Sequence, residues 1–228
     1  MIIFGHRGAP GYPRRAENTI ASFKKALQYG ATGLELDVRL AGDGRLVVIH
    51  DETVDRTTNG SGRVRDLTYE ELRQFDAGYG EPIPLLTDVL DEFGAQCLLN
   101  IELKDPGIAR DVKRLVLERQ LEPHVIVSAF DWEELRPLIP EVPIGLLSSR
   151  LWNLVRRAQE LGASAIHPRR NIVTKRLIGK ARDAKLRVHV WTVNDEATMR
   201  HLINLGVDGI ITDAPSLLLR VARELKRI

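Results

Sequence analysis

The chain has 228 residues, of which 43% are hydrophobic and 28% are charged, so it can bury a sizeable core and general disorder is excluded. Its 33 lysines and arginines nearly balance its 31 aspartates and glutamates, and a net charge of +2 argues against nucleic acid or an anionic membrane as the main partner. The single cysteine, Cys97, excludes an intrachain disulfide and a cysteine metal cluster. Because the sequence also lacks a long apolar run and a secretory signal, we expect a cytoplasmic protein without a membrane span.

Short apolar runs alternate with amphipathic stretches along the chain. Strands are predicted, in chain order, at residues 2–5, 34–40, 46–49, 98–103, 125–128, 144–147, 165–167, 188–193 and 209–212. Helices are predicted at residues 18–29, 109–119, 152–161, 175–184, 196–205 and 215–225. About eight strand–helix alternations in a chain of this length favour a (β/α)8 TIM barrel over an open doubly wound sheet. We therefore predict a TIM barrel of the α/β class.

One segment, residues 51–84, interrupts this alternation. It is long and polar, with several glycines, and it contains one predicted short helix that is capped by Thr68 and has Glu70 and Glu71 in its first turn. A loop of this length inside a compact domain usually serves a function. We predict one catalytic domain over residues 1–228, with an insertion at about 51–84 after the second strand region.

Charged side chains recur inside two of the predicted strands. Glu35 and Asp37 lie two residues apart, and Glu102 and Lys104 repeat this spacing on another strand. Successive strand residues point to opposite faces, so both members of each pair share a face. In a parallel barrel that face lines the interior, and active sites lie at the carboxyl ends of the strands. A surface antiparallel strand would give the same alternation for a single pair.

Three carboxylates on neighbouring strands need a compensating charge. Held together without a cation, Glu35, Asp37 and Glu102 would repel one another, and burial would raise their pKa values. A divalent ion relieves this repulsion. Because the candidate ligands are all oxygen atoms, Mg²⁺ or Ca²⁺ fits better than Zn²⁺, with Mn²⁺ as a further candidate. The sequence therefore predicts a metal site.

Two cations and two histidines accompany the carboxylates. Three carboxylates and one divalent ion sum to −1, so Arg7 and Lys104, which add +2, leave room for one monoanionic phosphodiester. Alternatively, Arg7 and Lys104 only balance the carboxylates. His6 and His50 each follow a predicted strand, and imidazoles are suited to proton transfer near neutral pH. The pattern predicts a phosphodiester site with an acid–base pair of histidines.

Several short blocks occur in a characteristic order over nearly the whole chain. They are His6-Arg7-Gly8-Ala9-Pro10, Glu17-Asn18-Thr19-Ile20-Ala21-Ser22-Phe23, Glu35-Leu36-Asp37-Val38, His50-Asp51, Asn100-Ile101-Glu102-Leu103-Lys104, Trp191-Thr192-Val193-Asn194 and Ile211-Thr212-Asp213-Ala214-Pro215. As an ordered set, the blocks resemble the glycerophosphodiester phosphodiesterase family. One departure is Ala16, which stands where the family usually has proline. We expect this change to have a small effect on stability and little on chemistry.

The resemblance implies a TIM-barrel hydrolase that converts glycerophosphodiesters to glycerol 3-phosphate and an alcohol, with a place in lipid and glycerol metabolism. It implies one divalent metal ion and a small-molecule substrate. It assigns these roles: metal ligands for Glu35, Asp37 and Glu102, an acid–base pair for His6 and His50, phosphate contacts for Arg7 and Lys104, and a wall beside the glycerol for Trp191. Asp51 would orient His50, serve the outer shell of the metal, or cap the loop.

Two other functions remain open from the residues alone. A phosphosugar isomerase or aldolase would use a glycine-rich phosphate loop near strands seven and eight, where Gly206 and Gly209 form no such cradle. A non-catalytic module that senses glycerol phosphates would be expected to lose a histidine or a carboxylate, whereas this chain has the whole set. The other histidines are interpreted as structural or surface residues: His124, His167, His189 and His201.

Overall fold

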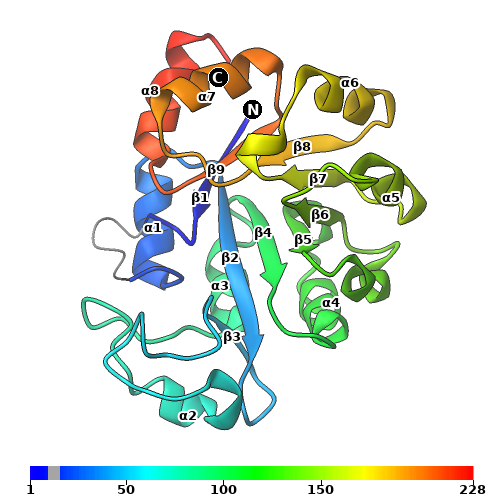
Figure 1. Ribbon diagram of the computed structural model, residues 1–228. Coiled ribbons are helices and arrows are strands. Elements are labelled where there is room, and N and C mark those ends of the chain that lie inside the picture. Colours follow the sequence, from blue (N-terminus) through cyan, green and yellow to red (C-terminus); the bar gives the residue numbers. More distant parts are fainter. Residues whose placement is uncertain (10–15, 228) are drawn as a thin grey trace.

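The computed structural model describes residues 1–9 and 16–227, so Pro10 of the first sequence block lies outside the described residues. Within them, a closed barrel of parallel strands forms the centre of the molecule (Figure 1). Its strands are β1 (Ile2–His6), β2 (Gly33–Leu40), β4 (Leu98–Leu103), β5 (Val125–Ala129), β6 (Ile144–Ser148), β7 (Ala165–Pro168), β8 (Arg187–Val190) and β9 (Gly209–Thr212). The barrel closes because β1 pairs with both β9 and β2. The predicted TIM barrel is confirmed.

Helices surround the strands and cover the outside of the barrel (Figure 1). They are α1 (Ile20–Gln28), α3 (Leu86–Phe93), α4 (Ala109–Glu118), α5 (Leu154–Glu160), α6 (Lys175–Asp183), α7 (Glu196–Leu205) and α8 (Pro215–Glu224). Between β5 and β6 a 3₁₀ helix, η3 (Trp132–Leu138), takes this place, and Pro137 inside it removes a backbone donor that an α-helix would use. None of the described helices has the length and apolar character needed to cross a membrane.

The sequence prediction missed α3. Its buried residues are Leu86, Val89, Leu90 and Phe93, which recur at the spacing of one helix face. Phe93 contacts Phe23 of α1, with ring centroids 5.8 Å apart. The signal was therefore present in the sequence, directly after the long polar segment.

Strand β2 shows how the sequence separates core from site. Leu34, Leu36 and Val38 are fully buried and belong to the apolar core between the strands and the helices. Burying one such side chain stabilises the fold by about 1.5–3 kcal/mol. The intervening Glu35 and Asp37 therefore face the opposite way, into the barrel. The apolar residues of β2 thus anchor the strand in the core, and the acidic residues between them point toward the candidate site.

The predicted strand at 46–49 is present as β3 (Leu46–Val48), but it is not a barrel strand. It pairs antiparallel with β2, because the short turn through Gly44, at φ +83°, can join antiparallel strands but not parallel ones. The predicted helix capped by Thr68 is confirmed as α2 (Tyr69–Leu72), and Glu71 completes a capping box.

The segment at 51–84 has a small apolar cluster of its own, which includes Val54, Val64, Leu72 and Ile83. The interpretation of the chain as one domain with an insertion at about 51–84 stays a prediction.

Strand β8 is shorter than predicted, since it ends at Val190 rather than at residue 193. Trp191 follows it and forms an isolated bridge with Arg169, at the carboxyl end of β7. The backbone N–H of Trp191 also donates to the Pro168 carbonyl, at 3.4 Å. Backbone pairing therefore continues to Trp191 beyond the regular strand, and this places the residue at the rim, where it lines a cavity.

Candidate active site

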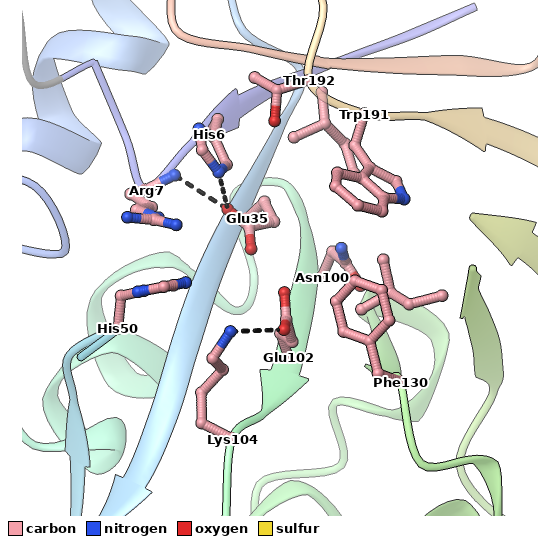
Figure 2. Close-up of a pocket in the computed structure, with 12 residues that line it drawn as sticks. His6, Arg7, Glu35, His50, Asn100, Glu102, Lys104, Phe130, Trp191 and Thr192 are labelled. Atoms are coloured by element: carbon pink, nitrogen blue, oxygen red, sulfur yellow. Dashed lines mark hydrogen bonds and ion pairs between the residues drawn. The ribbon is translucent and has the colours of Figure 1, made fainter. Parts of the chain in front are cut away.

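A cavity of about 230 Å³ opens at the carboxyl ends of the barrel strands (Figure 2). Its lining residues are His6, Arg7, Glu35, His50, Asn100, Glu102, Lys104, Phe130, Leu147, Trp191, Thr192 and Ile211. Of the predicted site residues, only Asp37 is missing from this lining, because it lies buried beneath the others with 1% of its surface exposed. The structure therefore brings the predicted residues into one place.

Three carboxylates form the base of the site. Glu35, Asp37 and Glu102 each offer an oxygen, and these atoms all lie within 4.8 Å of one another. The parallel register sets this arrangement, since Asp37 of β2 lies beside Glu102 of β4. Burial, together with the charges of Asp37 and Glu102, raises the pKa of Glu35 well above its usual value. Burial and the Asp37 charge raise the pKa of Glu102 to about 7.

This cluster fits a hard divalent cation. The donors are all carboxylate oxygens, which Mg²⁺ and Ca²⁺ prefer. The Oδ1 atom of Asp37 is buried and has no hydrogen-bond partner, although a buried polar atom normally has one. A cation among Glu35, Asp37 and Glu102 would coordinate this oxygen and reduce the repulsion between the three carboxylates.

Arg7 and Lys104 already compensate part of the negative charge. Arg7 donates its backbone N–H to Glu35 Oε2 at 3.0 Å, and its Nε lies 3.1 Å from Asp37 Oδ2. Lys104 Nζ lies 2.7 Å from Glu102 Oε1 and 3.6 Å from Asp37 Oδ1. Burial alone would raise the pKa of Asp37, but the Arg7 and Lys104 charges outweigh it and the pKa is lowered. Both cations therefore balance the carboxylates while lining the cavity.

His6 ends β1 and is held by an aspartate that the sequence analysis did not assign to the site. His6 Nδ1 lies 2.7 Å from Asp213 Oδ1, and Asn194 Nδ2 donates to Asp213 Oδ2 at 2.6 Å. Because a carboxylate only accepts, Nδ1 carries the proton. His6 Nε2 then faces Glu35 Oε2 at 4.0 Å. Asp213 directly follows β9, and that position at the rim was the available signal.

His50 has the same kind of partner. Its Nδ1 lies 2.6 Å from Asp51 Oδ1, so the predicted contact between Asp51 and His50 is present. Burial lowers the pKa of His50, and the Arg7 charge adds to this effect, while Asp37 acts in the opposite direction. Hydrogen bonds from Arg56 hold the pKa of Asp51 well below its usual range. The lowered pKa favours the neutral form of His50, and the hydrogen bond to Asp51 fixes the orientation of its ring.

Aromatic and aliphatic side chains form the other half of the cavity (Figure 2). Trp191 donates its indole N–H to the His167 carbonyl at 2.6 Å. Phe130 meets Trp191 edge to face, with ring centroids 5.4 Å apart. Phe130 is 51% exposed and follows β5 directly. The sequence analysis missed Phe130, because a single aromatic residue after a strand carries no specific signal.

The fold and this site define a TIM-barrel enzyme that acts on phosphate esters. The model of the glycerophosphoryl diester phosphodiesterase family matches residues 6–217. The chain belongs to this family, and it is an enzyme that hydrolyses glycerophosphodiesters. The resemblance of the sequence blocks is thereby confirmed.

Relatives and solved structures agree over nearly the full length. The chain is 39% identical to a glycerophosphodiester phosphodiesterase of Caldanaerobacter subterraneus, covering 98% of both chains. The crystal structure of a glycerophosphodiester phosphodiesterase from Agrobacterium tumefaciens is similar, with a TM-score of 0.87 and 31% sequence identity. The match covers 96% of this chain and 99% of the other. An Oleispira antarctica phosphodiesterase, solved in complex with the product sn-glycerol-3-phosphate, is 28% identical, with a TM-score of 0.83 and coverage of 98% and 97%.

Proposed function

We propose that this chain hydrolyses glycerophosphodiesters to glycerol 3-phosphate and an alcohol, with one divalent metal ion and with His6 and His50 as the acid–base pair. The observation that carries the proposal is the convergence of two carboxylate-held histidines and three clustered carboxylates on one cavity. The product bound to the Oleispira relative supports glycerol 3-phosphate as the product here. Family membership favours a hydrolase over the isomerase, aldolase and sensor alternatives.

Glu35, Asp37 and Glu102 would hold the metal ion, which we expect to be Mg²⁺ or Ca²⁺, with Mn²⁺ as a further candidate. When bound, the ion neutralises the carboxylates and polarises phosphate oxygen. Lys104 reaches two of these carboxylates, so it is placed to exchange a carboxylate for a substrate phosphate.

Arg7 and Lys104 are the proposed phosphate contacts, and Trp191 is the proposed wall beside the glycerol. The charged and apolar halves of the cavity match a substrate that carries a phosphate on one side and a carbon chain on the other. The guanidinium of Arg7 is already oriented by Asp37, which reduces the entropy lost when it binds an oxygen pair. The substrate is a small molecule, and we propose a cytoplasmic location on the basis of the single cysteine.

The proposed chemistry divides the proton transfers between the histidines. A glycerol hydroxyl beside the phosphate gives its proton to one histidine and forms a bond to phosphorus. The bond from phosphorus to the departing alcohol breaks, and that oxygen takes a proton from the other histidine. Water then opens the cyclic phosphate: its oxygen bonds to phosphorus, and the bond from phosphorus to the attacking glycerol oxygen breaks. The histidine that lost a proton takes one from the water, and the histidine that gained one gives it to the released glycerol oxygen. His6 and His50 reach the cavity from separate elements, which supports roles on opposite sides of the phosphorus (Figure 2).

A turnover screen tests the metal and the substrate class. Glycerophosphocholine, glycerophosphoethanolamine and bis(glycero)phosphate are each incubated with Mg²⁺, Ca²⁺, Mn²⁺ or a chelator, and released glycerol 3-phosphate is measured. We expect turnover with at least one ion and none with the chelator. Full activity after metal removal would show that the metal assignment is wrong, and binding without turnover would favour the sensor alternative.

A substrate with a nitrophenol leaving group tests the histidine roles. Nitrophenolate departs without acid catalysis, so one of the variants His6→Ala and His50→Ala should regain activity on it while the other should not. The surface variant His201→Ala is the matched control. Equal, large losses for both variants on both substrates would contradict the division into acid and base.

A further inference from the structure

Arg56 lies in the segment at 51–84, outside the cavity, and it bridges two carboxylates that hold site residues. Its Nε and Nη2 donate to the two oxygens of Asp51, at 2.5 and 2.9 Å. Its Nη1 and Nη2 donate to the two oxygens of Glu17, at 3.1 and 2.7 Å. One guanidinium thus makes two bidentate contacts. The ammonium group of a lysine cannot make both, because it lacks the planar fork of donors.

The first contact leads to His50. Asp51 Oδ1 accepts from Arg56 and also lies 2.6 Å from His50 Nδ1. The imidazole therefore takes its orientation from a carboxylate that is itself fixed in place. Without Arg56, Asp51 would keep its bond to the histidine but lose the partner that holds both of its oxygens.

The second contact leads to Arg7. Glu17 Oε1 accepts from Arg56 and from Arg7 Nη1, at 2.7 and 2.8 Å. The Glu17 side chain is only 2% exposed, and within the described parts of the chain these two arginines compensate its charge. Arg7 in turn reaches Asp37 through Nε. Removing Arg56 would leave Arg7 as the one cation paired with Glu17 among the described residues, and would draw the Arg7 guanidinium away from the cavity.

We propose that Arg56 is a positioning residue that fixes the catalytic histidine His50 and the phosphate contact Arg7 relative to each other. The inference rests on the proposed function of these two groups. It differs from an ordinary surface ion pair, because the chain of contacts runs from the segment at 51–84 through Asp51 and Glu17 to His50 and Arg7, which both line the cavity. The segment therefore takes part in assembling the site without touching the substrate.

Steady-state kinetics of Arg56→Ala tests the proposal, with Arg65→Ala as the matched control. Arg65 lies in the same segment and is exposed, and no ion pair joins its side chain to the described residues. We expect Arg56→Ala to lower kcat/KM by about 10- to 100-fold, the range typical of residues that orient groups in direct contact with the reaction. The control should match the wild type.

The two contacts predict a division between kcat and KM. Asp51 contacts His50 directly, so Asp51→Asn should mainly lower kcat, whereas Glu17 contacts Arg7 directly, so Glu17→Gln should mainly raise KM. Arg56→Ala should do both, and Arg56→Ala combined with Asp51→Asn should lower kcat no further than the stronger single change. A merely structural role would instead lower the melting temperature and leave both constants unchanged per folded molecule.

Arg56→Lys keeps the proposal testable if Arg56→Ala fails to fold. Lysine retains the charge but holds one carboxylate at most, so activity should fall between those of the wild type and Arg56→Ala. A folded lysine variant with wild-type kcat and KM overturns the inference. If the wild-type chain itself releases no glycerol 3-phosphate in the screen above, the proposed function fails instead, and the two failures are thereby distinguished.

Discussion

Glu102 illustrates how one side chain responds to crowded charges. It is flanked by Asp37 across the strand pair and by Lys104 two residues along its own strand. Glu102→Gln keeps the shape but removes one ligand charge. We expect weaker metal binding by calorimetry and a kcat lowered by more than about 100-fold. The exposed Glu118→Gln is the control, and wild-type metal affinity in Glu102→Gln would contradict the ligand assignment.

Trp191 is the residue for which packing and substrate contact must be separated. Its indole N–H donates to the His167 carbonyl, and the indole ring packs edge to face with Phe130. The side chain also forms part of the cavity wall. If it borders the glycerol, Trp191→Ala should raise KM by about 10-fold, equivalent to about 1.4 kcal/mol of lost binding. Trp191→Phe should restore much of the affinity. An unfolded alanine variant, with unchanged kinetics in its folded fraction, would identify the indole as core packing.

At the scale of elements, α2 depends on its cap. Its four residues are too short to form a helix in isolation, so tertiary contacts and the cap must hold it. The Thr68 hydroxyl accepts from the Glu71 N–H, and the Glu71 carboxylate reaches back to the Thr68 N–H at 2.8 Å. We expect Thr68→Ala to lower the free energy of unfolding by about 0.5–2 kcal/mol, measured by urea denaturation.

Thr68→Ser provides the control for the cap, because serine keeps the hydroxyl that accepts from the helix N–H. It should retain most of the wild-type free energy of unfolding. If serine and alanine destabilise the protein equally, the methyl group of Thr68 and not its hydroxyl supports the helix.

At the scale of the whole molecule, the barrel interior contains two fully buried histidines. His189 Nδ1 lies 3.1 Å from His167 Nε2, and neither of the two remaining ring nitrogens has a hydrogen-bond partner. Burial lowers the pKa of His167 to about 3, and burial together with His167 lowers the pKa of His189 well below its usual value. Their position agrees with the structural role expected for both residues. It also makes the free energy of unfolding decrease at acidic pH.

The direction of this pH dependence follows from the difference in proton binding between the folded and unfolded chain. The unfolded chain binds protons at both histidines below about pH 6.5, whereas the folded chain keeps them neutral down to much lower pH. Stability is therefore fully present above about pH 6.5 and is lost as the pH falls toward the folded pKa. The two sites together give a slope of about 2.7 kcal/mol per pH unit.

Urea denaturation between pH 7 and pH 4 measures this slope. His167→Gln removes one titrating site and should reduce the slope by about half. His124→Gln, on the surface, should leave it unchanged. An equal slope in His167→Gln and the wild type would mean that other groups, such as the clustered carboxylates, control acid stability.

The sequence by itself predicted the barrel, most strand positions and the eight candidate site residues, whereas it missed Phe130 and Asp213. Hydrophobic periodicity is local, so it places Glu35 and Asp37 on one face of β2 without knowledge of the neighbours. The same information assigned β3 a strand but could not show that it pairs antiparallel outside the barrel, because pairing partners are not encoded in the period.

Only the tertiary structure decided how the site residues are held. Asp213 reaches His6 across 207 positions of sequence because β9 pairs with β1 when the barrel closes. Arg56 reaches Glu17 because the segment at 51–84 folds back over the start of α1. Such contacts depend on how the barrel closes and on which distant side chains the closure brings within reach. A single sequence indicates only which chemical groups are present and which face of a strand they occupy.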